Sequence, residues 1–177
     1  MSGFLCRLPQ LLGDRRGAAA VEFALVVPMV IVIICSTLEA GWIMVQTIML
    51  DRALDQTVRE LRVGSLPNPT QQTIRENVCD RALVLHGCVN SIAIEMFPIT
   101  AQGTGYPSDA TRCVDRASPI APVLRFSQGA RSEIMFVRAC FVVSPLTPGL
   151  GLALALPTDA SGAMRIIARA GFVNEPV

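Results

Sequence analysis

The stretch from Phe23 to Leu38 reads FALVVPMVIVIICSTL, 16 residues without a charge. As a helix it would rise about 24 Å, at about 1.5 Å per residue. The hydrocarbon core of a bilayer is about 30 Å thick, so a membrane span must also draw on the residues at both ends. Ala18–Val21 and Gly41–Val45 are apolar enough to serve. We therefore predict a transmembrane helix over residues 18–46.

Two other interpretations of this stretch are weaker. A buried helix of a soluble protein would show a polar face, and this stretch shows none. A secretory signal peptide would end in a small-residue cleavage site, but Leu38-Glu39-Ala40 precedes Gly41. Cys6 has no small residues immediately before it, which disfavours a lipoprotein.

The flanking charges predict the orientation of the span. Arg7, Arg15 and Arg16 precede it, against a single acidic residue, Asp14. Because positive charge is retained on the cytoplasmic side, residues 1–17 are expected to be a cytoplasmic leader and the chain after the span to be translocated. The translocated part would be periplasmic or extracellular.

Composition argues against nucleic acid as a partner. Hydrophobic residues make up 51% of the chain and charged residues 16%, with a formal net charge of +1. No cluster of basic residues with aromatic residues among them is present, so the electrostatic attraction that nucleic acid needs is missing.

Six cysteines are present, and four follow the apolar stretch: Cys79, Cys88, Cys113 and Cys140. In an oxidising compartment these four can form two disulfides, in any of three pairings. The sequence does not choose among the three, although we favour Cys79–Cys88 with Cys113–Cys140.

The remaining sequence predicts an α+β domain at residues 64–177. Apolar residues at helical spacing extend the first helix over residues 47–63, so that one helix is expected from Ala18 to Val63. A second helix is predicted over 71–85, capped by Thr70. Strands are predicted over 89–99, 132–143 and 163–173, with a long loop at 100–122. The expected architecture is a long helix packed on a three-stranded antiparallel sheet.

Leu150–Leu156 is a short apolar segment between prolines. It predicts either a short buried helix or packed loop, which we favour, or a contact with another subunit.

No set of residues predicts catalysis or a bound cofactor. His86 is the only histidine, and its closeness to Cys88 suggests a metal site with Cys79. Disulfide bonding of the two cysteines is the favoured alternative, so no metal is expected. One histidine near a helix end is poor evidence for a catalytic triad, and no glycine-rich phosphate loop is present. We therefore expect no enzyme activity.

The junction before the span carries the most specific pattern. Glu22 lies just inside an otherwise apolar helix, where an unpaired carboxylate is costly. If the chain were cut after Gly17, Ala18 would gain an ammonium and Glu22 would be the fifth residue. Glu22 would then lie near a helix N-terminus, which favours negative charge, and could pair with an ammonium of its own or a neighbouring chain. The alternative, without a role in assembly, is that the Glu22 carboxylate reaches back to the cytoplasmic interface.

This junction resembles the processing site of type IV prepilins, in which a prepilin peptidase cuts after Gly and Glu is fifth. Glu22-Phe23 is similar to the Glu-Tyr pair of the tight-adherence (Tad, or Flp) branch. The run Gly-Ala-Ala-Ala-Val-Glu-Phe-Ala-Leu, followed by Pro28, resembles the TadE-like pseudopilins, and the ending Ala170–Pro176 resembles that family's C-terminal pattern.

The resemblance implies a minor pseudopilin of the bacterial inner membrane that takes part in assembly of a Tad pilus, for adhesion or secretion. Its partners would be other pilin subunits, the prepilin peptidase, the inner-membrane assembly platform and membrane lipid. The alternative is an uncleaved, membrane-anchored periplasmic binding module, for which the Gly17 junction is accidental.

Pro28 and Glu39 are two further positions of the helix for which the sequence supports a prediction. Pro28 lacks a backbone donor and crowds the carbonyl of Ala24, which predicts a kink or local opening. Glu39 is expected at the outer interface, with no chemical role.

Overall fold

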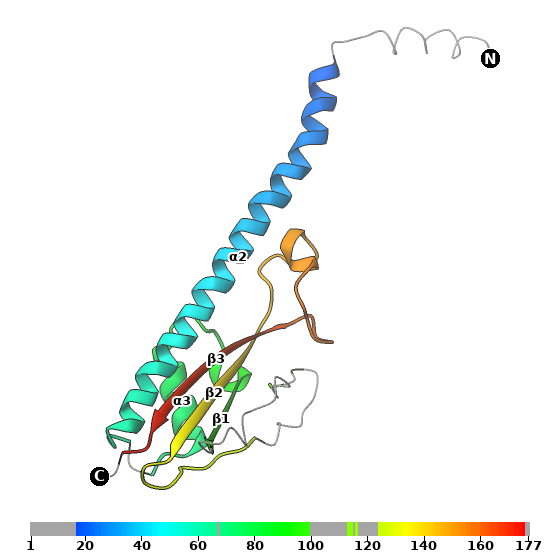
Figure 1. The fold of residues 1–177 in the computed structure, drawn as a ribbon. Helices are drawn as coiled ribbons and strands as arrows, with labels where there is room; N and C mark the ends of the chain where they lie inside the picture. Colours follow the sequence, from blue (N-terminus) through cyan, green and yellow to red (C-terminus); the bar gives the residue numbers. More distant parts are fainter. Residues whose placement is uncertain (1–16, 67, 100–112, 115, 117–123, 176–177) are drawn as a thin grey trace, which may run out of the picture.

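The computed structural model describes residues 17–66, 68–99, 113–114, 116 and 124–175. Its longest element is helix α2, 45 residues from Ala18 to Arg62, about 68 Å at about 1.5 Å per residue. The C-terminal half of α2 lies along a sheet, while the N-terminal half extends beyond the rest of the chain (Figure 1). The predicted single long helix is confirmed.

The sheet has three antiparallel strands, as predicted, and their order is β1-β2-β3. Their bounds are Ile92–Ile99 for β1, Ile134–Val143 for β2 and Met164–Val173 for β3. The free edge of β1 is partly covered, because Met96 exchanges backbone hydrogen bonds with Arg125 and Ser127.

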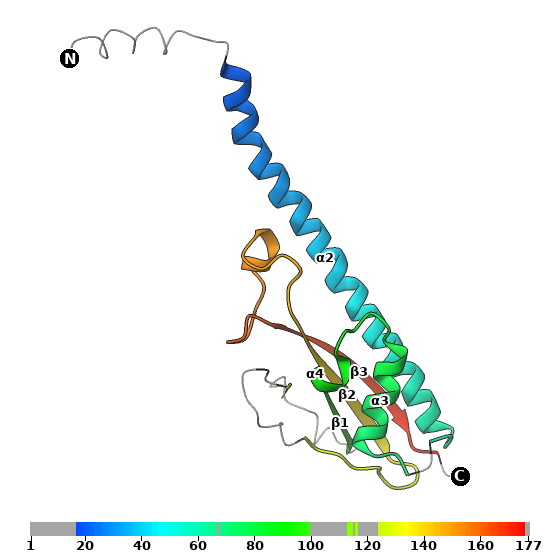
Figure 2. The same ribbon diagram turned by 180° about the vertical axis from the view of Figure 1, so that it is seen from behind.

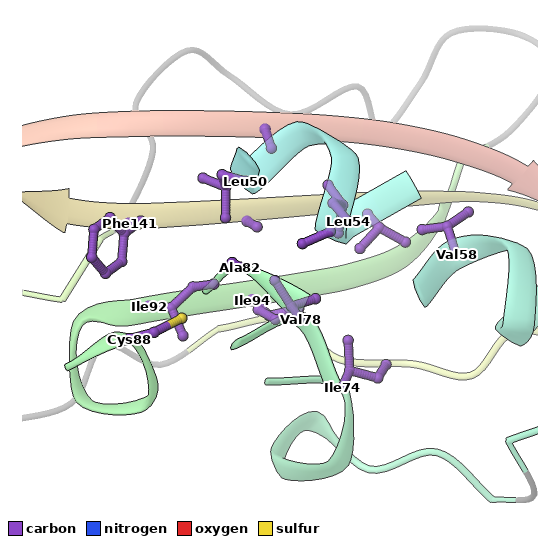
Figure 3. Close-up of a cluster of buried hydrophobic side chains, with 14 of the residues drawn as sticks. Leu50, Leu54, Val58, Ile74, Val78, Ala82, Cys88, Ile92, Ile94 and Phe141 are labelled. Carbon is purple, nitrogen blue, oxygen red and sulfur yellow. The ribbon is translucent and has the colours of Figure 1, made fainter. Parts of the chain in front are cut away.

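Helices α2 and α3 (Gln71–Arg81) cover the same face of the sheet (Figures 1 and 2). The core between them is apolar, and Figure 3 shows its centre. The helices contribute Leu50, Leu54, Val58, Ile74 and Val78, and the sheet contributes Ile92, Ile94, Met96, Val137, Phe141 and others. Burial of each leucine contributes about 1.5–3 kcal/mol, so this core fixes the sheet to the C-terminal half of α2.

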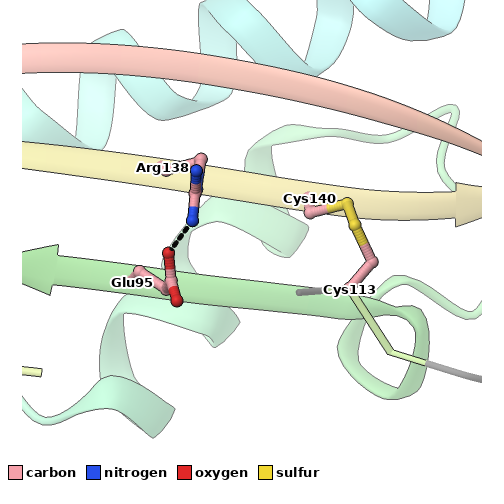
Figure 4. Close-up of a disulfide and its surroundings, with 4 residues drawn as sticks. All are labelled: Glu95, Cys113, Arg138 and Cys140. Atoms are coloured by element: carbon pink, nitrogen blue, oxygen red, sulfur yellow. Dashed lines mark hydrogen bonds and ion pairs between the residues drawn. A yellow bond between two sulfur atoms is a disulfide. The ribbon is translucent and has the colours of Figure 1, made fainter. Parts of the chain in front are cut away.

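The opposite face of the sheet is buried on β1 and β2 but mostly exposed on β3. Glu95 of β1 forms an ion pair with Arg138 of β2, and both side chains are nearly inaccessible to solvent. Cys140 lies on the same face and forms a disulfide with Cys113 (Figure 4). The first six residues of β1 are therefore all buried, instead of alternating between buried and exposed.

The boundary between the second helix and the first strand was predicted wrongly. Helix α3 ends at Arg81, not Leu85, and Val89–Ser91 belong to a short helix α4 (Cys88–Ser91) instead of the strand. The Cys79–Cys88 disulfide holds the two Cα atoms 5.5 Å apart. A helix continued to Leu85 would rise about 9 Å beyond Cys79 and leave three residues for the return, so the chain turns earlier.

Between β2 and β3 the chain forms a 3-10 helix, η2 (Gly151–Leu154). It lies beside α2, beyond the end of the sheet and toward the exposed half of the helix (Figure 1). The predicted long loop at 100–122 lies almost wholly outside the described residues.

Candidate assembly and anchoring site

The N-terminus of α2 places the predicted processing residues on one exposed turn. Gly17 is the N-cap, and no side chain caps the helix there. Ala18, Glu22 and Phe23 are exposed, Phe23 to 70%. No hydrogen bond or ion pair joins Glu22 to another described residue. The leader before Gly17 lies outside the described residues, so the cut after Gly17 remains a prediction.

The exposed surface of α2 is apolar over most of its N-terminal half. Large apolar side chains, each at least 37% exposed, follow one another along it: Val21, Phe23, Leu25, Val26, Met29, Val30, Ile31, Val32, Ile33, Ile34, Leu38, Met44, Val45 and Ile48. The helix is long and apolar enough to cross a membrane, and no residue of its most apolar part is buried. A core helix of a soluble protein would be mostly buried, so this surface fits a membrane anchor.

Pro28 lies within α2, and the helix continues through it from Ala18 to Arg62. The large apolar side chains on either side of Pro28, such as Val26, Met29 and Val30, are exposed. The kink expected at Pro28 remains a prediction.

Glu39 is the main feature that the sequence did not reveal. Its carboxylate is 0% exposed and accepts three hydrogen bonds from the segment between β2 and η2. The Leu146 amide donates to Oε1 at 2.9 Å, and the amide and hydroxyl of Thr147 donate to Oε2 at 2.7 and 3.0 Å. Glu39 therefore binds a loop more than 100 residues away, instead of lying free at an interface.

One turn earlier, α2 makes a second contact with the same loop. The Leu152 amide donates to Ser36 Oγ at 3.1 Å. Gly151 has φ +55°, and a Cβ added there would lie 2.4 Å from Ser36 Oγ and 3.2 Å from the Val32 carbonyl oxygen. Only glycine allows this close approach together with a left-handed backbone. The two contacts fix the loop to the apolar half of α2.

Residues 17–59 match the family model for TadE-like protein. Over this segment, here called the TadE-like segment, the chain is similar to that family. The TadE-like pilins are a structural, non-enzymatic family, and the match suggests an association with the Tad pilus. No curated protein and no solved structure matches the chain.

The TadE-like segment contains the junction, the apolar surface and Glu39, but not the loop that Glu39 binds. The sheet and η2 likewise lie outside residues 17–59. The resemblance of the ending Ala170–Pro176 to the family is therefore not tested by the match. In the structure, Asn174 bonds to the turn before β2, donating from Nδ2 to the Gln128 and Ala130 carbonyls.

The cysteines beyond the TadE-like segment are joined in the two favoured pairs, Cys79–Cys88 and Cys113–Cys140. Each pair has Cα atoms 5.5 Å apart, an ordinary disulfide separation. His86 is exposed, and no three metal-ligating side chains gather among the described residues. The arrangement offers a helix for packing and anchoring and a cross-linked domain attached to it.

Proposed function

We propose that this chain is a minor pseudopilin of a Tad-type pilus, matured by prepilin peptidase cleavage after Gly17. The leader would comprise residues 1–17, the membrane helix 18–46, its extension 47–63 and the periplasmic domain 64–177. The mature helix would pack among other pilin helices during assembly on the inner-membrane platform. The observation that carries this proposal is the exposed apolar helix with Glu22 five residues after Gly17, inside the TadE-like segment.

The structure supplies a physical reason for Glu22. Cleavage would start the mature chain at Ala18, the first residue of α2. The new ammonium and the free backbone amides of the first turn would make that end positive, and Glu22 lies one turn along with no described partner. In an apolar assembly of helices, the carboxylate of one chain would pair with the N-terminus of another and set their relative height.

Glu22→Ala tests the assembly role. We expect the variant to be inserted and stable but to be lost from sheared pilus fractions, because the helix keeps its apolar surface and loses only the pairing charge. Glu76→Ala is the matched control, since Glu76 is an exposed carboxylate of α3, far from the membrane helix. Unchanged recovery of the Glu22 variant would favour the uncleaved anchored module.

N-terminal sequencing of the protein from a host with the matching peptidase tests the processing step separately. We expect a chain that begins at Ala18. Recovery of only the uncut chain, beginning at Met1 or Ser2, would contradict cleavage whatever the Glu22 variant does.

A further inference from the structure

The segment Pro145–Pro157, here called the η2 loop, is an apolar surface whose partner the proposed function does not specify. It contains no ionisable side chain, and neither does the chain on either side from Ala139 to Thr158, apart from the disulfide-bonded Cys140. Leu146, Leu150 and Leu154 are 55, 36 and 72% exposed. A surface loop of a water-soluble domain would not expose three leucines so close together without a partner.

The position of the η2 loop along α2 indicates what this partner is. Ser36 and Glu39, which hold the loop, follow Glu22 by 14 and 17 residues. At about 1.5 Å per residue they lie about 21 and 26 Å from Glu22. If Glu22 lies at the cytoplasmic boundary, both are still within a hydrocarbon core of about 30 Å.

The side chains of α2 at this level agree with that depth. Ile33, Ile34 and Leu38 are at least half exposed, and they lie in the same turns of α2 as Ser36 and Glu39, which contact the loop. Gln46, farther along the helix, is buried toward the domain like Glu39. No charged side chain of α2 is therefore exposed between Glu22 and Asp51.

The backbone of the η2 loop also meets part of the requirement of a non-aqueous setting. Irregular backbone at membrane depth is tolerated only where its polar groups find partners in the protein. Many of its amides donate to oxygen atoms of α2 or of the loop itself: those of Leu146, Thr147, Leu150, Leu152, Ala153 and Ala155. Pro145, Pro148 and Pro157 have no amide hydrogen to satisfy.

We propose that the η2 loop is a membrane-contacting element, inserted into the outer leaflet beside α2, with Leu146, Leu150 and Leu154 in contact with lipid acyl chains. Glu39 and Ser36 fix it there by accepting its backbone hydrogen bonds. The loop thereby sets the height of the domain above the bilayer before assembly. This inference rests on the membrane span of the proposed function, but not on cleavage or on pilus assembly.

Tryptophan placed at single positions of the full chain tests the loop. Trp42 is the one native tryptophan, so each new tryptophan is introduced into a Trp42→Phe variant. The protein is then reconstituted at low density in phosphatidylethanolamine–phosphatidylglycerol vesicles. Leu154→Trp and Leu146→Trp are expected to emit at short wavelength and to be quenched by lipids brominated near the headgroup. Leu83→Trp is the matched control, because Leu83 is 82% exposed and lies between α3 and α4, outside α2 and the η2 loop; it should emit as in water and resist quenching.

Val30→Trp reports on the span itself and should be quenched by lipids brominated near the chain end. Quenching of Val30→Trp with water-like, unquenched emission from both loop positions would overturn the loop proposal and leave the membrane span intact. Absence of quenching at Val30 would overturn both. Short-wavelength emission from the loop that resists brominated lipid and changes with protein density would mean that a second copy covers it, which also overturns lipid contact.

Discussion

At the scale of single residues, Glu39 shows how a charge is accommodated in an apolar helix. A carboxylate at the centre of a membrane helix costs about 2.5–3.5 kcal/mol or more. Three hydrogen bonds from Leu146 and Thr147 occupy both carboxylate oxygens and remove them from contact with solvent or lipid. Glu39, the charged residue that ends the apolar stretch of the sequence, is therefore part of the fold of the domain that follows this stretch.

Glu39→Gln is expected to release the η2 loop. Glutamine replaces one carboxylate oxygen by an NH₂ group, which would face a donor of the loop. Loss of hydrogen bonds to a charged acceptor should lower the free energy of local opening by about 1.5–3 kcal/mol. Hydrogen exchange measures this as a loss of protection of about 10- to 100-fold at the Leu146 and Thr147 amides.

Thr37→Ala is the matched control for Glu39→Gln. Thr37 is exposed, and its hydroxyl donates to the Ile34 carbonyl within the same helix. Its loss should leave exchange in the loop unchanged. Equal protection in the Glu39 variant and the parent protein would show that Glu39 does not hold the loop.

The Asp159 carboxyl, in the turn that leads into β3, is expected to make the stability of the domain depend on pH. Hydrogen bonds from the Ser161 hydroxyl, with those from the backbone amides of Ala163 and Ser161, hold the pKa of the Asp159 carboxyl below its ordinary value. A lowered pKa in the folded state means that the stabilisation is present above the unfolded pKa of about 3.9 and is lost as the pH falls through the folded pKa.

Asp159→Ala should therefore lower the melting temperature at about pH 7, and its difference from the parent protein should disappear near or below about pH 3. Thermal unfolding at the two pH values measures this difference. Asp80→Ala, which removes an exposed carboxylate of α3, should show no such pH-dependent difference. A constant deficit of the Asp159 variant at both pH values would assign the effect to packing instead of charge.

At the scale of elements, the sequence predicts what depends on local pattern. Helix α2 follows from an uncharged run and an apolar stripe, and the three strands follow from apolar, β-prone runs. The predicted end of α3 and the predicted start of β1 were wrong, since a disulfide and the left-handed Gly87, at φ +64°, override helical propensity there. The contact of the η2 loop with Glu39 joins positions 107 residues apart, which no local pattern reveals.

Gly151 and Gly149 form a matched pair for testing that long-range contact. Both have positive φ, +55° and +79°, but only Gly151 faces close neighbours, Ser36 Oγ and the Val32 carbonyl. Gly149→Ala should cost only the left-handed backbone, about 1–2 kcal/mol. Gly151→Ala should cost a further amount of about 1–3 kcal/mol because the new methyl group overlaps α2.

Exchange protection at the Leu152 amide, which donates to Ser36, compares these two variants directly. Greater loss in the Gly151 variant is expected. Equal loss would mean that the loop lies farther from the helix than the structure has it.

At the scale of the whole molecule, two different forces hold the domain together on the two faces of its sheet. The face toward α2 and α3 is an apolar core. The other face carries the Glu95–Arg138 ion pair beside the Cys113–Cys140 disulfide. The N-terminal half of α2 contributes to neither, so under the proposed function it could exchange lipid for neighbouring helices without unfolding the sheet.

The two disulfides should then stabilise the domain unequally. They close 9 and 27 residues of sequence, and loop-closure entropy predicts a loss of about 2.6 kcal/mol for Cys79→Ala/Cys88→Ala and about 3.6 kcal/mol for Cys113→Ala/Cys140→Ala. Denaturant unfolding of the full chain in detergent measures both losses.

Cys35→Ala is the control, because Cys35 is a free cysteine of α2 and should leave the unfolding midpoint of the domain unchanged. The larger loss is expected for the Cys113–Cys140 pair because this disulfide closes the longer loop. A reversed order would show that the shorter disulfide, by fixing α3 to α4, controls the stability of the whole domain.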